Sequence, residues 1–203
     1  MNSVMDLAHK VRDHVNHPWK RELISSNRVK WDKVCSCMDV LEDTQLAIDH
    51  FFKLPEFSGN DGGYLYLYGL LQAYFLQQDA TDNLSQALFD KSVDWKNEYP
   101  DLHLVRELRN DATGHPTSRH NDKSFHYIAR YSVSKHSFKL ASYFPKQQQS
   151  YLSRDFNLND LNNKHEKSIC DLLNKVVQSL KDDLSNHVTT KNRKNQPKKK
   201  LKN

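Results

Sequence analysis

Apolar side chains recur every three or four residues along several stretches of this chain, the spacing of residues on one face of an α-helix. These stretches span residues 4–15, 28–53, 101–113 and 158–188. Residues 64–76 are apolar on nearly every face, as expected of a helix at the centre of a bundle. Only five glycines and six prolines punctuate the 203 residues, so the elements are long and the turns few. The sequence predicts a mainly α fold, an up-and-down helical bundle.

Two shorter stretches alternate apolar and polar residues, which is the period of a β-strand. They cover residues 125–131 and 138–144, with a polar turn at 134–137. We expect a β-hairpin inserted into the bundle at about residues 124–144. Such a hairpin could cover a face of the bundle, extend a dimer interface or contact RNA.

Three polar residues, Gln77, Gln78 and Asp79, follow the apolar segment and are expected to interrupt its helix. Polar groups inside a bundle cost free energy unless they are hydrogen-bonded. These side chains therefore either reach solvent at the end of the bundle or find partners inside it. In the second case, Gln78 and Asp79 are candidates for orienting the functional residues described below.

The positive charge of the chain lies at its C-terminal end. Removing the seven basic residues of the last segment from the net charge of +5 leaves the rest of the chain at −2. We expect one folded domain over residues 1–188, followed by a disordered tail over 189–203 that is too polar to bury itself. Such a tail is most often simply solvated, but it could also attract RNA without regard to sequence. Its basic residues are Lys191, Arg193, Lys194, Lys198, Lys199, Lys200 and Lys202.

Cysteine usage and hydropathy indicate a cytoplasmic protein. Cys35, Cys37 and Cys170 form neither a disulfide framework nor a paired zinc motif. No apolar run approaches the roughly 18 residues that a membrane span requires, and the N-terminus lacks the core of a signal peptide. We expect no membrane association.

The sequence also lacks the usual signatures of metal and cofactor sites. His14 and His17 have no carboxylate at the spacing of a zinc site, and Pro18 ends their helix. There is no phosphate-binding glycine loop followed by lysine, no nucleophile elbow and no carboxylate pair at catalytic spacing. We therefore expect neither a metal nor a cofactor.

Arg109, Asn110 and His115 form the strongest candidate for chemistry. Cleavage of RNA without a metal needs a base near the 2′-hydroxyl, a cation on the phosphoryl oxygens and an acid for the leaving oxygen. Imidazole exchanges protons near neutral pH, and guanidinium stays charged and grips two phosphate oxygens at once. Asn110 could orient either partner.

The spacing of the motif requires the helix to end inside it. In an unbroken α-helix, His115 would lie roughly 240° around the axis from Arg109. Gly114 can adopt the left-handed conformation that ends helices, and Pro116 moves His115 out of the helical region. We therefore expect the chain to leave the helix near Thr113 and His115 to fold back toward Arg109.

An Arg, a polar residue, a short spacer and a His at the end of a bundle helix resemble the motif of the HEPN family. Arg109, Asn110 and His115 match that motif, so residues 109–115 carry the resemblance. The resemblance implies a metal-independent endoribonuclease of a defence or toxin–antitoxin system. It also implies a homodimer that pairs its two motifs in one composite cleft, with a cognate antitoxin or regulator protein as a further partner.

The resemblance assigns roles to individual residues. His115 acts as base or acid, Arg109 stabilises the charged phosphorane, and Asn110 orients them. The expected supporting residues are Gln78, Asp79, Arg106 and Asp111. Some family members carry a tyrosine two residues after the histidine, which a partner nucleotidyltransferase modifies, whereas this chain has Thr117.

Two other functions stay open at this point. The first is a non-catalytic HEPN-like module that binds RNA, a nucleotide or a protein partner, in which Arg109 and His115 only hold the loop. The second is an unrelated helical interaction protein, in which the motif arises by coincidence.

Overall fold

A computed structural model describes residues 2–119, 121–148 and 150–194 of the chain. The described part is mainly helical, as the sequence predicts, with one small antiparallel sheet of order β1-β2-β3. The helices are α1 Val4–Val15, α2 Pro18–Ser25, α3 Arg28–Lys53, α4 Gly63–Phe89, α5 Trp95–Glu98, α6 Pro100–Arg109 and α7 Leu158–Lys194, with short helical turns η1 Gly59–Asp61 and η2 Asn110–Gly114. The strands are β1 Phe125–Ile128, β2 Ser137–Tyr143 and β3 Tyr151–Asn157.

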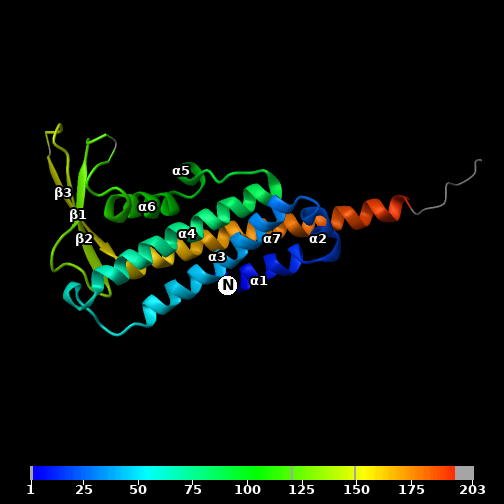
Figure 1. Cartoon of the computed structure of the whole chain (residues 1–203), viewed down its shortest axis with the longest axis horizontal. Helices are drawn as coiled ribbons and strands as arrows, with labels where there is room; N and C mark the ends of the chain where they lie inside the picture. The colour runs from blue at the N-terminus through cyan, green and yellow to red at the C-terminus, as the bar shows by residue number, and fades with distance from the viewer. Residues whose placement is uncertain (1, 120, 149, 195–203) are drawn as a thin grey trace, which may run out of the picture.

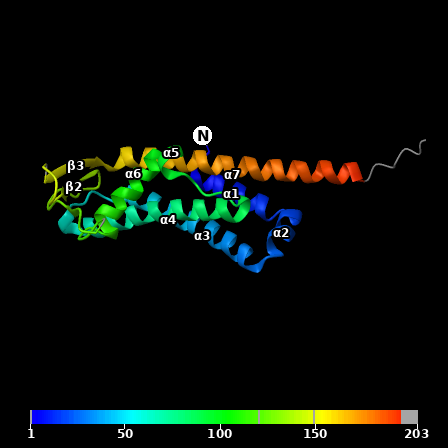
Figure 2. The same cartoon turned by 90° about the horizontal axis from the view of Figure 1, so that it is seen from above.

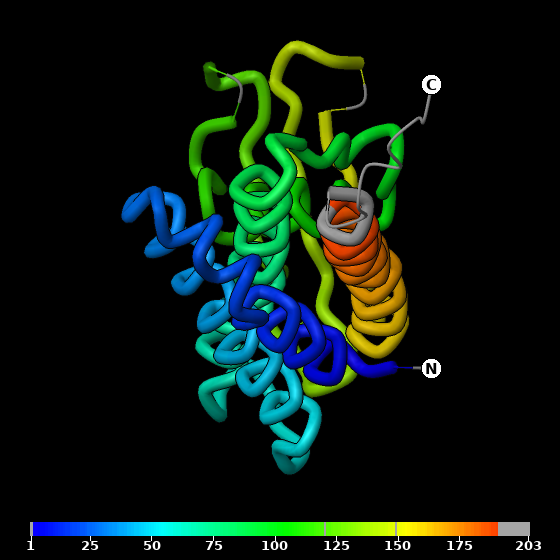
Figure 3. The backbone as a smooth tube through the Cα atoms, turned by 90° about the vertical axis from the view of Figure 1, so that its right-hand side faces the viewer, coloured from blue at the N-terminus to red at the C-terminus, as the bar shows by residue number. Residues whose placement is uncertain are grey.

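The long helices α3, α4 and α7 run along the long axis of the molecule, and the sheet lies at one end of them (Figure 1). α7 extends from the sheet past the opposite end of the bundle, where α2 lies (Figure 2). Seen along the long axis, α1, α3, α4 and α7 surround a common centre (Figure 3). The bundle therefore has two distinct ends, one with the sheet and one with α2.

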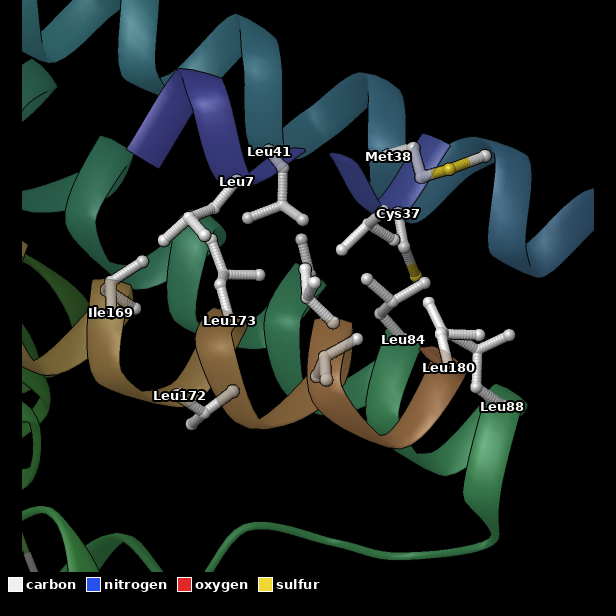
Figure 4. Close-up of a cluster of buried hydrophobic side chains, with 14 of the residues drawn as sticks. Leu7, Cys37, Met38, Leu41, Leu84, Leu88, Ile169, Leu172, Leu173 and Leu180 are labelled. Carbon is white, nitrogen blue, oxygen red and sulfur yellow. The ribbon is translucent and has the colours of Figure 1, made fainter. Parts of the chain in front are cut away.

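The core at the α2 end is built mainly from aliphatic side chains of α1, α3, α4 and α7. Leu7 of α1, Leu41 of α3, Leu84 of α4 and Leu173 of α7 are completely buried against one another (Figure 4). Burying one such side chain contributes about 1.5–3 kcal/mol relative to leaving it in water. The helical period of the sequence predicts the positions on α1, α3 and α7, whereas Leu84 lies beyond the predicted central helix.

A second apolar cluster lies at the sheet end. Leu71 and Tyr74 of α4 and Leu108 of α6 pack there with Phe138 and Leu140 of β2. Through these contacts, the inner face of the sheet rests on the bundle. The end of α6 and the sheet therefore share one core.

A layer of polar side chains separates the two apolar clusters. It is formed by Gln45 of α3, Gln77 and Gln78 of α4, and His165 of α7, all buried. The Gln77 amide donates to Oε1 of Gln45 at 3.0 Å. Within the described residues, the amide group of Gln78 and Nε2 of His165 make no hydrogen bond. This layer has a cost in stability, because buried polar groups without partners are unfavourable.

The structure corrects the expected interruption of the central helix. α4 continues through residues 77–79 to Phe89 without a break. Gln77 finds its partner on α3, and Asp79 forms an ion pair with Arg106 of α6. Gln77 is thus accommodated by a partner inside the bundle, and the partly exposed Asp79 by a partner on the neighbouring helix α6.

Two further elements differ from the sequence prediction. Pro18 does not only end the first helix; it occupies the first turn of α2, where its missing N–H is not needed. The predicted hairpin is part of a three-stranded sheet, because β3 pairs with β2 from Tyr143–Tyr151 to Ser137–Asn157.

The last helix is longer than the sequence predicts. α7 continues to Lys194, so Lys191, Arg193 and Lys194 of the expected tail are helical. The hydroxyls of Thr189 and Thr190 bond to carbonyls four residues back, so the polar segment stays compatible with the helix. Lys198, Lys199 and Lys200 lie outside the described residues.

Burial of His165 makes the stability of the bundle depend on pH. Burial lowers the pKa of His165 to about 3, and its ring lies 4.3 Å from the Tyr74 ring. The folded state keeps the imidazole neutral, whereas the unfolded chain protonates it below about 6.5. His165 therefore does not lower the free energy of unfolding above pH 6.5. As the pH falls from 6.5 toward 3, it lowers this free energy by up to about 1.4 kcal/mol per pH unit.

We expect the substitution His165→Met to reduce the loss of stability between pH 7.5 and pH 5. The measurement is the free energy of urea unfolding at each pH. The control is His9→Met, which changes an exposed histidine on α1. Equal pH dependence of the His165 variant and the wild type would contradict this assignment.

Candidate active site

The helix that carries the motif ends in a widened turn. α6 stops at Arg109, and residues Asn110–Gly114 form a π-helical turn. The backbone N–H of His115 donates to the carbonyl of Asn110 at 2.8 Å, which closes this turn. Single π turns are frequent at functional sites. The chain thus leaves the helix inside the motif, as the sequence predicts.

Gly114 serves a different purpose from the one expected. Gly62 is the described glycine with a positive φ, so Gly114 does not adopt the left-handed conformation. A Cβ at position 114 would lie 2.8 Å from Nη1 of Arg109 and 3.3 Å from Oδ1 of Asn110. Glycine is needed here to leave room for the guanidinium of Arg109.

The guanidinium of Arg109 is held in one orientation. Its Nε and Nη2 donate to Oε1 of Gln72 at 3.1 and 2.9 Å, and its Nη1 donates to Oδ1 of Asn110 at 3.0 Å. Its Cζ lies 4.2 Å from the centre of the Phe75 ring. A guanidinium has five N–H groups, so two remain for a ligand.

Arg109 lies in the wall of an open groove. The groove has a volume of about 400 Å³. Its lining consists of Tyr68, Gln72, Arg109, Ala112, Thr113 and Pro116. A ligand in this groove would meet the guanidinium on one side and the Tyr68 side chain on another.

His115 lies next to the groove in the chain, between Gly114 and Pro116. Its side chain is exposed. Within the described residues, the imidazole makes no hydrogen bond, and it does not line the groove. The structure therefore brings Arg109 and Asn110 into contact, whereas a shared pocket for Arg109 and His115 stays a prediction.

Arg106 precedes Arg109 by three residues on α6, and Asp79 of α4 contacts Arg106. Nη1 of Arg106 lies 2.7 Å from Oδ1 of Asp79. The Arg106 guanidinium is 4.4 Å from the centre of the Phe75 ring, so both arginines contact one aromatic side chain. The carboxylate of Asp79 neutralises Arg106, which leaves it less suited than Arg109 to bind phosphate.

Gln78 and Asp111 contact other parts of the molecule. Gln78 is completely buried in the polar layer of the core and makes no hydrogen bond to Arg109 or to any other described residue. Asp111 is buried on the sheet side, where its carboxylate lies 2.9 Å from Nε of Arg119 and 3.5 Å from Nη2 of Arg154. Asp111 therefore anchors the sheet to the turn.

Sequence reasoning missed Gln72 and Phe75, the two residues that position Arg109. A signal for Gln72 exists, because it is the single amide in the apolar segment 64–76. No comparable signal marks Phe75, which is one aromatic residue among several. Their role depends on the packing of α4 against α6.

Neither a protein-family model, nor a curated protein, nor a solved structure matches this chain. Among the described residues, no three His, Cys, Asp or Glu side chains converge in a way that could hold a metal ion. No helix among these residues is long and apolar enough to span a membrane.

We expect the substitution Gly114→Ala to displace the Arg109 guanidinium while the fold stays intact. The added methyl group would clash with the end of a long side chain and not with backbone, so the unfolding free energy should change by less than about 1 kcal/mol. The measurement is the Nε–H NMR signal of Arg109, which should shift. Thr117→Ala is the control, because Thr117 is exposed and does not line the groove. An unshifted signal in the Gly114 variant would refute the proposed packing.

Proposed function

We propose that this chain is a metal-independent endoribonuclease that cleaves RNA by attack of the 2′-hydroxyl. The observation that carries this proposal is the guanidinium of Arg109, fixed in the wall of an open groove with two N–H groups left for a ligand. The adjacent His115 supplies an exposed imidazole.

The partners of Arg109 leave its charge available. Gln72 and Asn110 hold it through neutral amide oxygens. Arg106 and Arg119, in contrast, form ion pairs with carboxylates of Asp79 and of Glu107 and Asp111. A guanidinium that is oriented without being neutralised is suited to bind a phosphodiester and to stabilise the charge that develops on it.

The proposed reaction divides its proton transfers between two imidazoles. One His115 accepts the proton of the 2′-hydroxyl while the 2′-oxygen bonds to phosphorus. Arg109 binds the phosphoryl oxygens as negative charge builds on them. The bond from phosphorus to the 5′-oxygen breaks, and that oxygen takes a proton from a second imidazole. The products are a 2′,3′-cyclic phosphate and a 5′-hydroxyl end.

A homodimer would supply the second imidazole. On α4, the exposed residues Leu65, Tyr68, Gly69 and Leu76 surround Gln72, the partner of Arg109. Leu65 is 74% exposed, and apolar surface of this kind marks interaction sites. We propose that this α4 face pairs with its copy and brings two motifs into one cleft, as the HEPN resemblance implies.

The biological setting is part of the same proposal. A cytoplasmic ribonuclease of this kind fits a defence or toxin–antitoxin system, with RNA as substrate and a cognate antitoxin or regulator as protein partner. This setting is supported only by the resemblance of residues 109–115 to the HEPN motif.

We expect the purified protein to cleave single-stranded RNA in EDTA. His115→Ala should lower the rate by about 10²- to 10⁴-fold, because a positioned acid or base contributes that much. Arg109→Ala should lower it by about 10²- to 10³-fold, through loss of charge stabilisation. The measurement is the cleavage rate, with circular dichroism to verify the fold.

The controls for this experiment are His9→Ala and Arg28→Ala, which change exposed residues on α1 and α3. Equal rates in all variants and the wild type would refute the catalytic assignment. If both motif variants lose thermal stability and the wild type does not cleave RNA, the non-catalytic module is the correct function. That result would assign Arg109 to holding the turn.

We expect Leu65→Lys to shift the protein from dimer to monomer, because a buried lysine at the α4 face would be desolvated. Sedimentation velocity measures the shift, and RNA cleavage should fall in parallel. Leu46→Lys is the matched control, since Leu46 is 59% exposed on α3 and lies outside this face. A monomeric wild type that cleaves RNA would exclude the composite cleft.

A further inference from the structure

The outer face of the sheet carries a row of three tyrosines, one on each strand. The row consists of Tyr127 on β1, Tyr143 on β2 and Tyr151 on β3. The ring centres of Tyr127 and Tyr143 are 5.8 Å apart, and those of Tyr143 and Tyr151 are 5.2 Å apart. The rings therefore form one continuous aromatic surface.

The register of the sheet places these residues on the face away from the core. Tyr143 pairs directly with Tyr151, and Tyr127 pairs with Ala141, two residues before Tyr143. The opposite face carries the stacked pair Phe138 and Phe156, which packs on the bundle. Alternation along each strand thus separates an inner face from the tyrosine row.

The tyrosine row is open to solvent. Tyr127, Tyr143 and Tyr151 are 43%, 43% and 45% exposed. The solvent face of an antiparallel sheet is ordinarily polar. Adjacent aromatic rings at such positions indicate a surface that binds a partner.

A backbone hydrogen bond links the first strand of the row to the lining of the candidate active site. The N–H of His126 in β1 donates to the carbonyl of Pro116 at 2.7 Å, and Pro116 lines the groove of Arg109. Tyr127 follows His126 in the same strand. Of the three tyrosines, Tyr127 is therefore the one on the strand that is bonded to Pro116. A polymer that leaves the groove past Pro116 would meet this strand first.

Basic side chains accompany the row. Lys139 lies on the same face of β2 as Tyr143, and its Nζ is 3.4 Å from the carboxylate of Asp155. Lys123 and Lys146 are exposed, just before β1 and just after β2. Aromatic rings next to cations suit a nucleic acid, which has anionic phosphates and planar bases, more than a neutral sugar chain.

We propose that the tyrosine row binds unpaired bases of single-stranded RNA by stacking, and so holds the strand whose backbone enters the Arg109 groove. This inference rests on the proposed function, because it takes RNA as the ligand. Unpaired bases are specified because a double helix keeps its base faces stacked inside. Lys123 and Lys146, which are exposed on either side of the first two strands, supply contacts to phosphates.

The experiment measures binding without cleavage. Fluorescence anisotropy with a labelled nine-nucleotide single-stranded RNA is carried out in EDTA, on protein that carries His115→Ala. Adding Tyr143→Ala or Tyr151→Ala should weaken binding by about 5- to 100-fold, because one stacked base contributes about 1–3 kcal/mol. Tyr143→Phe should keep the affinity, since it keeps the ring.

Tyr131→Ala is the matched control. Tyr131 is 82% exposed in the loop between β1 and β2, outside the row. Its removal should leave the affinity unchanged. The phenylalanine variant also separates stacking from a loss of folding, because it preserves the packing of the face.

Several outcomes overturn the proposal. Equal affinity of the Tyr143→Ala and Tyr131→Ala variants, preference for duplex RNA, or binding of a neutral oligosaccharide in place of RNA would each do so. Tyrosine-dependent binding together with no cleavage by the wild type would refute the nuclease and support the row. Cleavage of RNA by the wild type, together with binding that does not depend on the tyrosines, would refute RNA binding by the row and leave the nuclease proposal standing.

Discussion

The buried carboxylate of Asp111 connects the turn that follows α6 to the sheet. It lies in the π turn that follows α6, and it pairs with Arg119 of the next loop and Arg154 of β3. His126 of β1 approaches the same carboxylate at 3.5 Å. Removing one member of a buried ion pair leaves an uncompensated charge, so such a cluster strongly fixes its geometry. The groove at Arg109 and the tyrosine row keep their relative positions because both are attached to this turn and sheet.

Three arginines near the turn show how partners decide what a charge can do. Arg106 and Arg119 contact carboxylates, which neutralise their positive charge inside the protein. Arg109 contacts two amide oxygens and the face of Phe75. It is oriented by neutral groups, and its charge is directed to whatever enters the groove. The contacts of an arginine thus decide whether its charge is neutralised inside the protein or left available.

The polar layer in the core lowers the stability of the bundle but fixes how its helices align. Gln45, Gln77, Gln78 and His165 form a polar layer where continued leucine packing would stabilise the bundle more. Since this layer lies between two apolar clusters, sliding one helix against another would move polar groups into hydrocarbon. The layer thus favours a single register of α3, α4 and α7, while the packing of α6 on α4 brings Arg109 to Gln72 and Phe75.

The periodicity of the sequence determined the long helices and their buried faces, because burying one apolar stripe is a property of each segment alone. Gly114 and Pro116 predicted a helix end near Thr113, and the helix does end there in a π turn, although Gly114 does not adopt the expected left-handed conformation. β3 was missed because it is a mostly exposed edge strand, paired through its backbone, with no apolar alternation. Only the tertiary structure decided that Gln72 and Phe75 hold Arg109, that Gln78 is buried, that Asp111 faces the sheet and that three tyrosines align. Each of these depends on residues brought together from distant segments, and their contacts follow from packing, which local sequence does not encode.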